Sequence, residues 1–143
     1  MGKAIYIGSA LLFVTVIIGL VIALQYLFMP PFDESLLGSS LDQIRAFNPN
    51  VLDTMTLNAR LSGLYLLTTA LLGAFVLALP FRKGEKWAWY AMLVVIGIGV
   101  LAQLWFVYDA GSLMLSYTLP VAVVLVLLWA VGLAVSATEI LKR

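Results

Sequence analysis

The sequence predicts an all-α integral membrane protein, a four-helix bundle with a short amphipathic helix in its first extracytoplasmic loop. Of the 143 residues, 64% are apolar and 10% are charged, whereas a soluble domain has roughly 45–50% and about 25%. The mean hydropathy is +1.10, so polar side chains are too few to cover a water-facing surface. Four long apolar stretches are each near the roughly 20 residues that cross a bilayer. The length corresponds to one domain, residues 1–143.

Prolines and charges bound the apolar stretches. We expect spans at about residues 5–29, 57–80, 87–109 and 113–138, with an outer loop at 30–56. Pro30 and Pro80 end the first two spans, because proline lacks the backbone N–H and clashes with the preceding turn. The spans are expected to be helices, since a backbone in lipid must bond to itself and no polar alternation indicates a barrel. The first span is too long for a signal peptide and is expected to be retained.

The fourth span contains Pro120, which leaves two starts open. A helix that begins near Ser112 would be bent by this proline in its second turn. A helix capped by Thr118 would hold it in the first turn, where proline is tolerated. The apolar run from Leu113 to Tyr117 favours the continuous, bent helix.

Basic residues predict the orientation. One side of the predicted topology carries Lys3, Arg82, Lys83, Lys86, Lys142 and Arg143, and the other carries Arg45, Arg60 and five carboxylates. The positive-inside rule therefore places both termini in the cytoplasm of a prokaryotic cell, with the chain in the cytoplasmic membrane. The inner hairpin is expected to be anchored in lipid by Arg82, Lys83, Lys86, Trp87 and Trp89. Gly84 suits a positive φ in this hairpin.

The outer loop has the pattern of a short helix. Ser40 and Gln43 form a capping-box pattern, and apolar residues at helical spacing follow within residues 41–47. Asn50 can cap the next helix, which then runs into the second span. The short helix either lies on the lipid surface or covers a cavity as a lid.

Small and polar residues form stripes along the spans. They comprise Gly8, Thr15, Gly19, Ala23 and Tyr26; Asn58, Ser62, Tyr65 and Thr69; Met92, Ile96, Gly99, Gln103 and Phe106; and Trp129, Gly132 and Ser136. Such stripes pack helices against one another in lipid, or they line a polar pocket. Both interpretations require the stripes to face inward.

The intramembrane polar residues gather in the outer half of the predicted bundle. The candidate ligand-binding residues are Gln25, Arg60, Ser62, Tyr65, Gln103, Asp109 and Tyr117. If they converge, they line a crevice that opens outward. Arg60 either snorkels or pairs with Asp109 or Asp53, or it contacts an anionic ligand through its guanidinium fork.

Composition excludes several kinds of chemistry. The chain has no cysteine and no histidine, which removes disulfides, thiol nucleophiles, imidazole ligation of metals and the commonest general base. We expect no metal, no cofactor and no catalytic residue. The net charge of +1 gives no field that favours nucleic acid. No carboxylate or lysine lies in the middle of a span, which argues against a proton relay.

The second and third spans carry a composite pattern, Asn58-x-Arg60-x-x-Gly63, then Gly73, then a basic and aromatic hairpin at 82–89. The pattern covers about one quarter of the chain. It resembles that of small, mostly uncharacterised four-helix prokaryotic membrane proteins, loosely similar to the DoxX group. The resemblance implies the four-helix membrane fold. DoxX-type proteins are associated with quinone-linked oxidoreductase complexes, a role that the pattern does not transfer.

Three functions follow from these features. The first is a non-catalytic accessory subunit, which binds the lipid bilayer and other membrane subunits or itself. The second is a binder or carrier of a lipophilic small molecule, a quinone, isoprenoid or lipid, in the outward crevice. The third is an enzyme that acts on a membrane substrate through Arg60, Tyr65, Asp109 and Tyr117. The lack of reactive residues favours the first.

Overall fold

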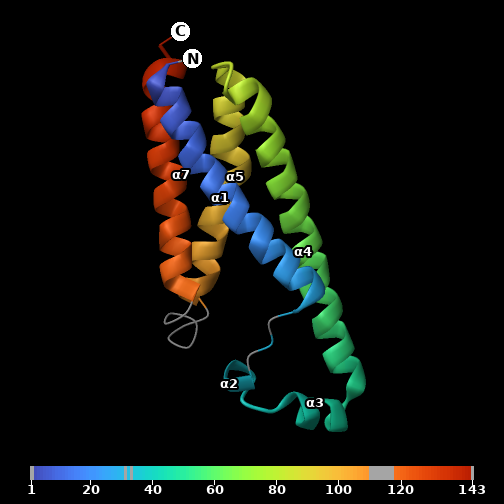
Figure 1. The fold of residues 1–143 in the computed structure, drawn as a ribbon. Coiled ribbons are helices and arrows are strands. Elements are labelled where there is room, and N and C mark those ends of the chain that lie inside the picture. The colour runs from blue at the N-terminus through green and yellow to red at the C-terminus, as the bar shows by residue number, and fades with distance from the viewer. Residues whose placement is uncertain (1, 31, 33, 110–117, 143) are drawn as a thin grey trace. The chain divides into compact units, whose positions relative to one another are not determined.

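The computed structural model describes residues 2–30, 32, 34–109 and 118–142, without the side chains of residues 35, 36, 106, 107, 109 and 118. Its regular elements are the helices α1 (Lys3–Phe28), α2 (Glu34–Leu37), α3 (Leu41–Phe47), α4 (Pro49–Val76), the π-helical turn η1 (Leu77–Phe81), α5 (Lys86–Asp109) and α7 (Thr118–Ile140) (Figure 1). The all-α prediction is confirmed for this part of the chain. Four helical segments are long and apolar enough to cross a membrane: α1, α4 with η1, α5 and α7.

The chain divides into two compact units, residues 1–18 with 69–143, and residues 19–68. The first unit contains the N-terminal part of α1, the end of α4, η1, α5 and α7. The second contains the rest of α1, the short helices α2 and α3, and most of α4.

In the first unit, two tryptophans join α5 and α7 in a reciprocal pair of hydrogen bonds. The indole Nε1 of Trp89 on α5 donates to the backbone oxygen of Leu133 on α7 at 3.1 Å. The indole of Trp129 on α7 donates to the backbone oxygen of Met92 on α5 at 3.3 Å. Because an unpaired N–H is costly in an apolar environment, each bond favours the side-by-side packing of these helices.

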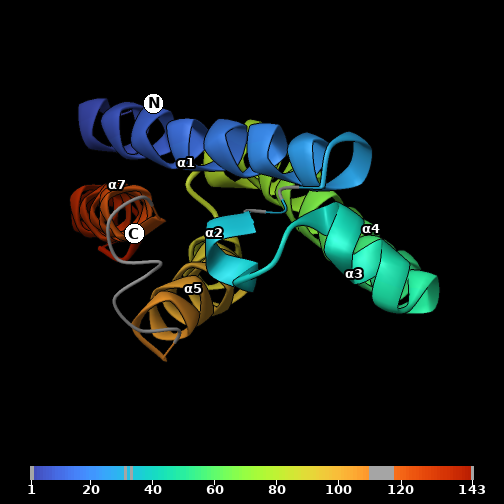
Figure 2. The same cartoon turned by 90° about the horizontal axis from the view of Figure 1, so that it is seen from below.

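Glycines allow the helices of this unit to approach closely. A Cβ built on Gly8 would lie 2.6 Å from the backbone oxygen of Gly132 and 2.7 Å from the Cβ of Ser136. The first half of α1 therefore packs directly against α7, as both views show (Figures 1 and 2). The predicted packing role of Gly8, Gly132 and Ser136 is confirmed. On α5, Met92 and Ile96 of the predicted stripe are buried. The prediction is wrong for Gly99, which faces open space, whereas Gly97 contacts the Trp129 ring.

In the second unit, the packed face of α4 is not the predicted polar stripe. Gly63 is buried, and a Cβ there would lie 2.9 Å from the backbone oxygen of Ala23 on α1. Asn58, Ser62 and Tyr65 are exposed on α4, with Tyr65 at 70%. The expectation that this stripe faces inward is therefore wrong for these three residues. Close backbone approach at a glycine selects the packed face instead.

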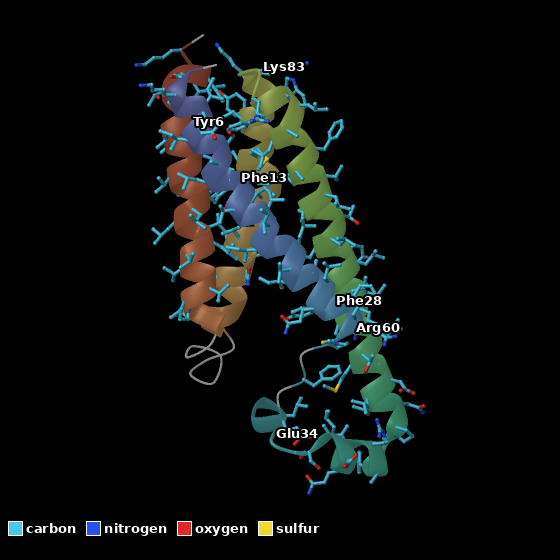
Figure 3. The ribbon with its side chains drawn as sticks, viewed as in Figure 1. Tyr6, Phe13, Phe28, Glu34, Arg60 and Lys83 are labelled. Atoms are coloured by element: carbon cyan, nitrogen blue, oxygen red, sulfur yellow. The ribbon has the colours of Figure 1, made fainter. Side chains whose placement is uncertain are left out.

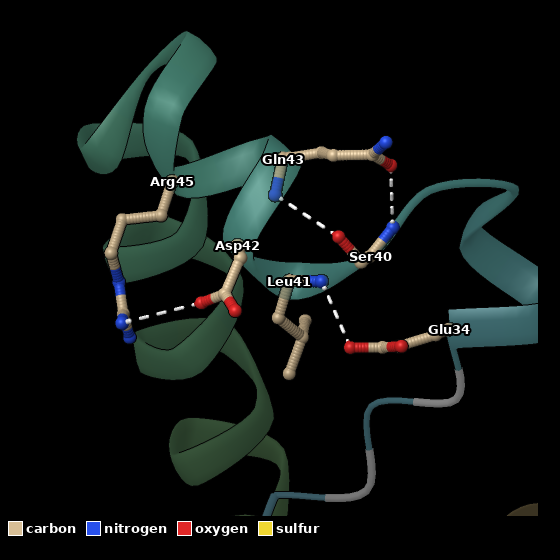
Figure 4. A network of polar contacts seen from close by, with 6 residues as sticks. All are labelled: Glu34, Ser40, Leu41, Asp42, Gln43 and Arg45. Atoms are coloured by element: carbon tan, nitrogen blue, oxygen red, sulfur yellow. Dashed lines mark hydrogen bonds and ion pairs between the residues drawn. The ribbon is translucent and has the colours of Figure 1, made fainter.

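The predicted short helix with its capping box is present as α3 (Figure 4). The Ser40 hydroxyl accepts from Gln43 N at 3.2 Å, and the Gln43 side chain accepts from Ser40 N at 3.0 Å. The carboxylate of Glu34, on α2, also accepts from the backbone N–H of Leu41 at 3.0 Å. Phe47, at the end of the predicted apolar stripe, is 90% exposed.

Two predicted helix boundaries differ from the observed ones. The start of α4 is capped by Asn48 and not by Asn50, since the Asn48 side-chain oxygen accepts from Asn50 N at 3.0 Å. Pro49 then occupies the first helical position, where its missing N–H costs nothing. At the other end, Pro80 does not end the helix but lies inside η1, which ends at Phe81.

Two further predictions concern turns. The positive φ of Gly84 is confirmed at 76°. The described part of α7 begins at Thr118, so Pro120 lies in its first turn. The predicted start of the fourth span near Leu113 lies outside the described residues.

We expect Gly97→Ala to weaken the packing of α5 on α7, because the new Cβ would lie 2.6 Å from the Trp129 ring. Overpacking of this kind costs about 1–3 kcal/mol. Thermal unfolding in detergent, followed by tryptophan fluorescence, should show a lower midpoint. Gly99→Ala is the matched control, since it adds the same methyl group to open space on the same helix. Equal midpoints for the two variants would contradict the assigned contact.

Candidate functional site

The first unit contains an open groove between the N-terminal part of α1 and the end of the α4–η1 segment. Its deeper part has a volume of about 310 Å³ and is lined by Tyr6, Ser9, Ala10, Phe13, Leu77, Ala78 and Arg82. A second part of about 470 Å³ is lined by Gly2, Lys3, Tyr6, Ile7 and Arg82. Because Tyr6 and Arg82 line both, we treat them as one site, the cationic groove.

The α1 wall of the cationic groove follows from helical spacing. Tyr6, Ser9 and Phe13 are separated by three and four residues and so share one face of α1 (Figure 3 shows Tyr6 and Phe13). Ser9 is buried, and its hydroxyl donates to the backbone oxygen of Tyr6 at 2.9 Å. Tyr6 is 61% exposed. The wall therefore presents the Tyr6 phenol near the N-terminus of α1 and the Phe13 ring two turns further along the helix.

The opposite wall depends on η1. Leu77 begins this π-helical turn, and Arg82 follows it directly. The backbone N–H of Glu85 donates to Pro80 O at 3.2 Å, and that of Gly84 donates to Phe81 O at 2.9 Å, so the turn ends in a defined hairpin. A π turn contains more residues than an α turn and recurs at functional sites. Here it lies next to the arginine that lines the groove.

The N-terminus of α1 is held by a carboxylate from the other end of the chain. Glu139, near the end of α7, accepts from Ala4 N at 3.3 Å and from Ile5 N at 3.4 Å. Its negative charge lies at the positive end of the α1 dipole, which is the favourable arrangement. This contact fixes the first turn of α1, which carries Lys3 and Tyr6.

Basic residues dominate this end of the unit. The described cations near the chain ends and the hairpin are Lys3, Arg82, Lys83, Lys86 and Lys142, and the described carboxylates are Glu85 and Glu139. Both carboxylates already accept hydrogen bonds, Glu85 from the Trp87 indole and Glu139 from the α1 backbone. Among the described side chains the ion pair present is Arg45–Asp42, at 4.0 Å in the second unit (Figure 4).

None of the predicted ligand-binding residues whose side chains the structure describes lines the cationic groove. Gln25, Arg60, Ser62 and Tyr65 belong to the second unit and are exposed. The Ser62 hydroxyl donates to Asn58 O at 2.9 Å, within its own helix. Within the described side chains, Arg60 forms no ion pair with Asp53.

The other predicted ligand residues are on or after α5. Gln103 is half-buried on α5 in the first unit. The Asp109 side chain and all of Tyr117 lie outside the described residues, so the pairing of Arg60 with Asp109 stays a prediction, as does the outward crevice.

The predicted lipid anchors divide into three environments. Arg82 is exposed and lines the groove, whereas Lys83, Lys86 and Trp87 are exposed outside its lining. Trp89 is half-buried and bonded to α7, so it joins two helices in addition to any contact with lipid.

Sequence reasoning missed Tyr6, the groove and the Glu139 contact. The spacing of Tyr6, Ser9 and Phe13 was a usable signal for a shared face, but its partner wall depends on how the helices pack. Neither a family model, nor a curated protein, nor a solved structure matches this chain. The DoxX resemblance therefore stays a prediction.

We expect Glu139→Ala to destabilise the protein, because two backbone donors of α1 lose their acceptor. Loss of a helix N-terminal acceptor costs about 0.5–2 kcal/mol. The unfolding midpoint in detergent should fall for Glu139→Ala and fall less for Glu139→Gln, which retains one acceptor oxygen. Thr138→Ala is the control, since its hydroxyl bonds only within α7, to Val135 O. A midpoint for Glu139→Ala that equals the control would contradict the capping role.

Proposed function

We propose that the chain is a single-domain, non-catalytic, multi-pass membrane protein whose four apolar helical segments cross the bilayer as a bundle. It serves as an accessory subunit that binds transmembrane helices of a larger membrane complex. The observation that carries this proposal is the exposed polar stripe of α4, Asn58, Ser62 and Tyr65.

The surface of the apolar helices supports insertion in a membrane. In the most apolar window of each span only 28–33% of the residues are buried. Large apolar side chains such as Phe75, Ile98 and Leu127 are exposed. In water such surface would drive aggregation, whereas acyl chains or neighbouring apolar helices cover it at no cost.

The polar stripe supports a helix as neighbour rather than lipid alone. An amide group such as that of Asn58 loses the hydrogen bonds that water would give it when it faces acyl chains. A transmembrane helix that supplies polar groups restores those bonds and gains close packing. The adjacent face of α4, at Gly63, already contacts α1, so the stripe is the side that a partner can reach.

The reactive residues of the sequence support a non-catalytic role. Without cysteine and histidine, an enzyme would depend on Arg60, Tyr65, Asp109 and Tyr117. The first two are exposed on α4, and no motif spacing links the set.

A photo-reactive residue placed at Ser62 should crosslink to one membrane protein in native membranes, and the adduct should persist as a complex in mild detergent. Asn58→Leu with Tyr65→Phe should reduce the adduct several-fold, because both changes remove polar groups from the stripe. The matched control places the photo-reactive residue at Leu72, an exposed apolar position of the same helix. Crosslinks to lipid only, together with a monomer in nanodiscs, would contradict the proposal.

The proposed orientation places both termini and the 82–86 hairpin in the cytoplasm. Since the chain has no cysteine, single cysteines can report it directly. In intact cells, Lys83→Cys should resist a membrane-impermeant maleimide and Glu34→Cys should react. After permeabilisation both should react. The reverse pattern would show the opposite orientation.

A further inference from the structure

We propose that the cationic groove is a binding site for one anionic phospholipid. The phosphate lies between Lys3 and Arg82, and an acyl chain follows Phe13 and Leu77 along the groove. This inference requires insertion in a membrane, and it is independent of the helix association proposed above.

The groove has the polarity gradient of an amphipathic ligand. Its outer part is lined by two cationic side chains, Lys3 and Arg82, and by the Tyr6 phenol. Its deeper part shares Tyr6 and Arg82 with the outer part and adds Phe13, Leu77 and small residues in place of Lys3. A phospholipid has the same order of charge and apolar surface. The volume of about 310 Å³ falls in the range of about 300–1,000 Å³ in which small-molecule sites lie.

The charges of the groove are unbalanced within the described part of the chain. Lys3 and Arg82 come from different helical segments and line the same cavity, so their like charges repel. Neither forms an ion pair with a described carboxylate. The two carboxylates at this end, Glu85 and Glu139, accept hydrogen bonds from the Trp87 indole and the α1 backbone. An anion between the two cations therefore stabilises the arrangement.

Geometry distinguishes the groove from the general basic surface of the hairpin. Lys83 and Lys86 carry the same charge at the same end, but neither lines the groove. Arg82 presents a planar fork that suits two phosphate oxygens, and Lys3 presents a point charge. Glu139 bonds to the backbone of Ala4 and Ile5, so the first turn of α1, which carries the exposed Lys3, is held before a lipid arrives. A site of this kind retains one lipid, whereas exposed lysines attract anionic lipids diffusely.

The test is native mass spectrometry of the full chain, taken from vesicles of phosphatidylcholine with phosphatidylglycerol as the anionic minority. We expect one retained phosphatidylglycerol per chain. Lys3→Gln with Arg82→Gln should lower its retention about tenfold or more, since each cation near the surface contributes to binding. Lys83→Gln with Lys86→Gln, the charge-matched control, should retain it. Equal losses in the two double variants would show diffuse attraction only and would overturn the proposal.

Two further variants test the apolar part without changing charge. Ala10→Trp fills the groove and should displace the lipid, whereas Leu79→Trp, at an exposed position outside the lining, should not. Retention in Ala10→Trp equal to that in the control would overturn the assigned acyl path. Circular dichroism of each variant verifies the fold. Glycerol phosphate and inorganic phosphate serve as soluble competitors, and displacement by either at millimolar concentration would show a site for free anions in place of a lipid site.

Discussion

The close contact of α5 and α7 is the constraint on which the first unit depends. Lipid tails are as apolar as the helix surfaces, so burial of apolar area gives little driving force for helix association in a membrane. What remains is close packing and hydrogen bonding. The indoles of Trp89 and Trp129 supply the hydrogen bonds between the helices. Gly97 allows the close packing, because the Trp129 ring lies against it. Because each indole bonds to the backbone of the other helix, the two helices hold one register along their length.

That register places the C-terminal end of α7 beside the N-terminal part of α1, where it packs against α1 and bonds to its first turn. Gly8 packs against Gly132 and Ser136 at backbone distance. One turn further along α7, Glu139 accepts hydrogen bonds from the first-turn N–H groups of Ala4 and Ile5. The two contacts are about one helical turn apart on α1, so they fix both its position and its first turn. The cationic groove is a consequence, since its α1 wall cannot be formed until this helix is held in place.

The helices could be predicted from the sequence because apolar length and capping chemistry are local. The capping box of Ser40 and Gln43 and the positive φ of Gly84 depend on a few neighbouring residues. Local rules failed where two similar residues compete: Asn48 and Asn50 can both cap, and the proline between them decides for Asn48. Gly97 and Gly99 differ only in rotational phase, which spacing alone does not fix. The Glu139 contact joins residues 135 positions apart, and no local pattern indicates it.

The prediction of an inward polar stripe failed for a reason that bears on function. A polar side chain in an apolar span needs a hydrogen-bond partner, but that partner can belong to another polypeptide. On α4 the packed face is chosen by Gly63, whose lack of a Cβ lets α1 approach, and the polar residues are left on the exposed side. The same reasoning applies to the cations of the groove, since the described carboxylates at that end already serve the α1 backbone and an indole. These surface polar groups are the basis of the two proposed neighbours, a helix beside α4 and an anionic headgroup at Arg82.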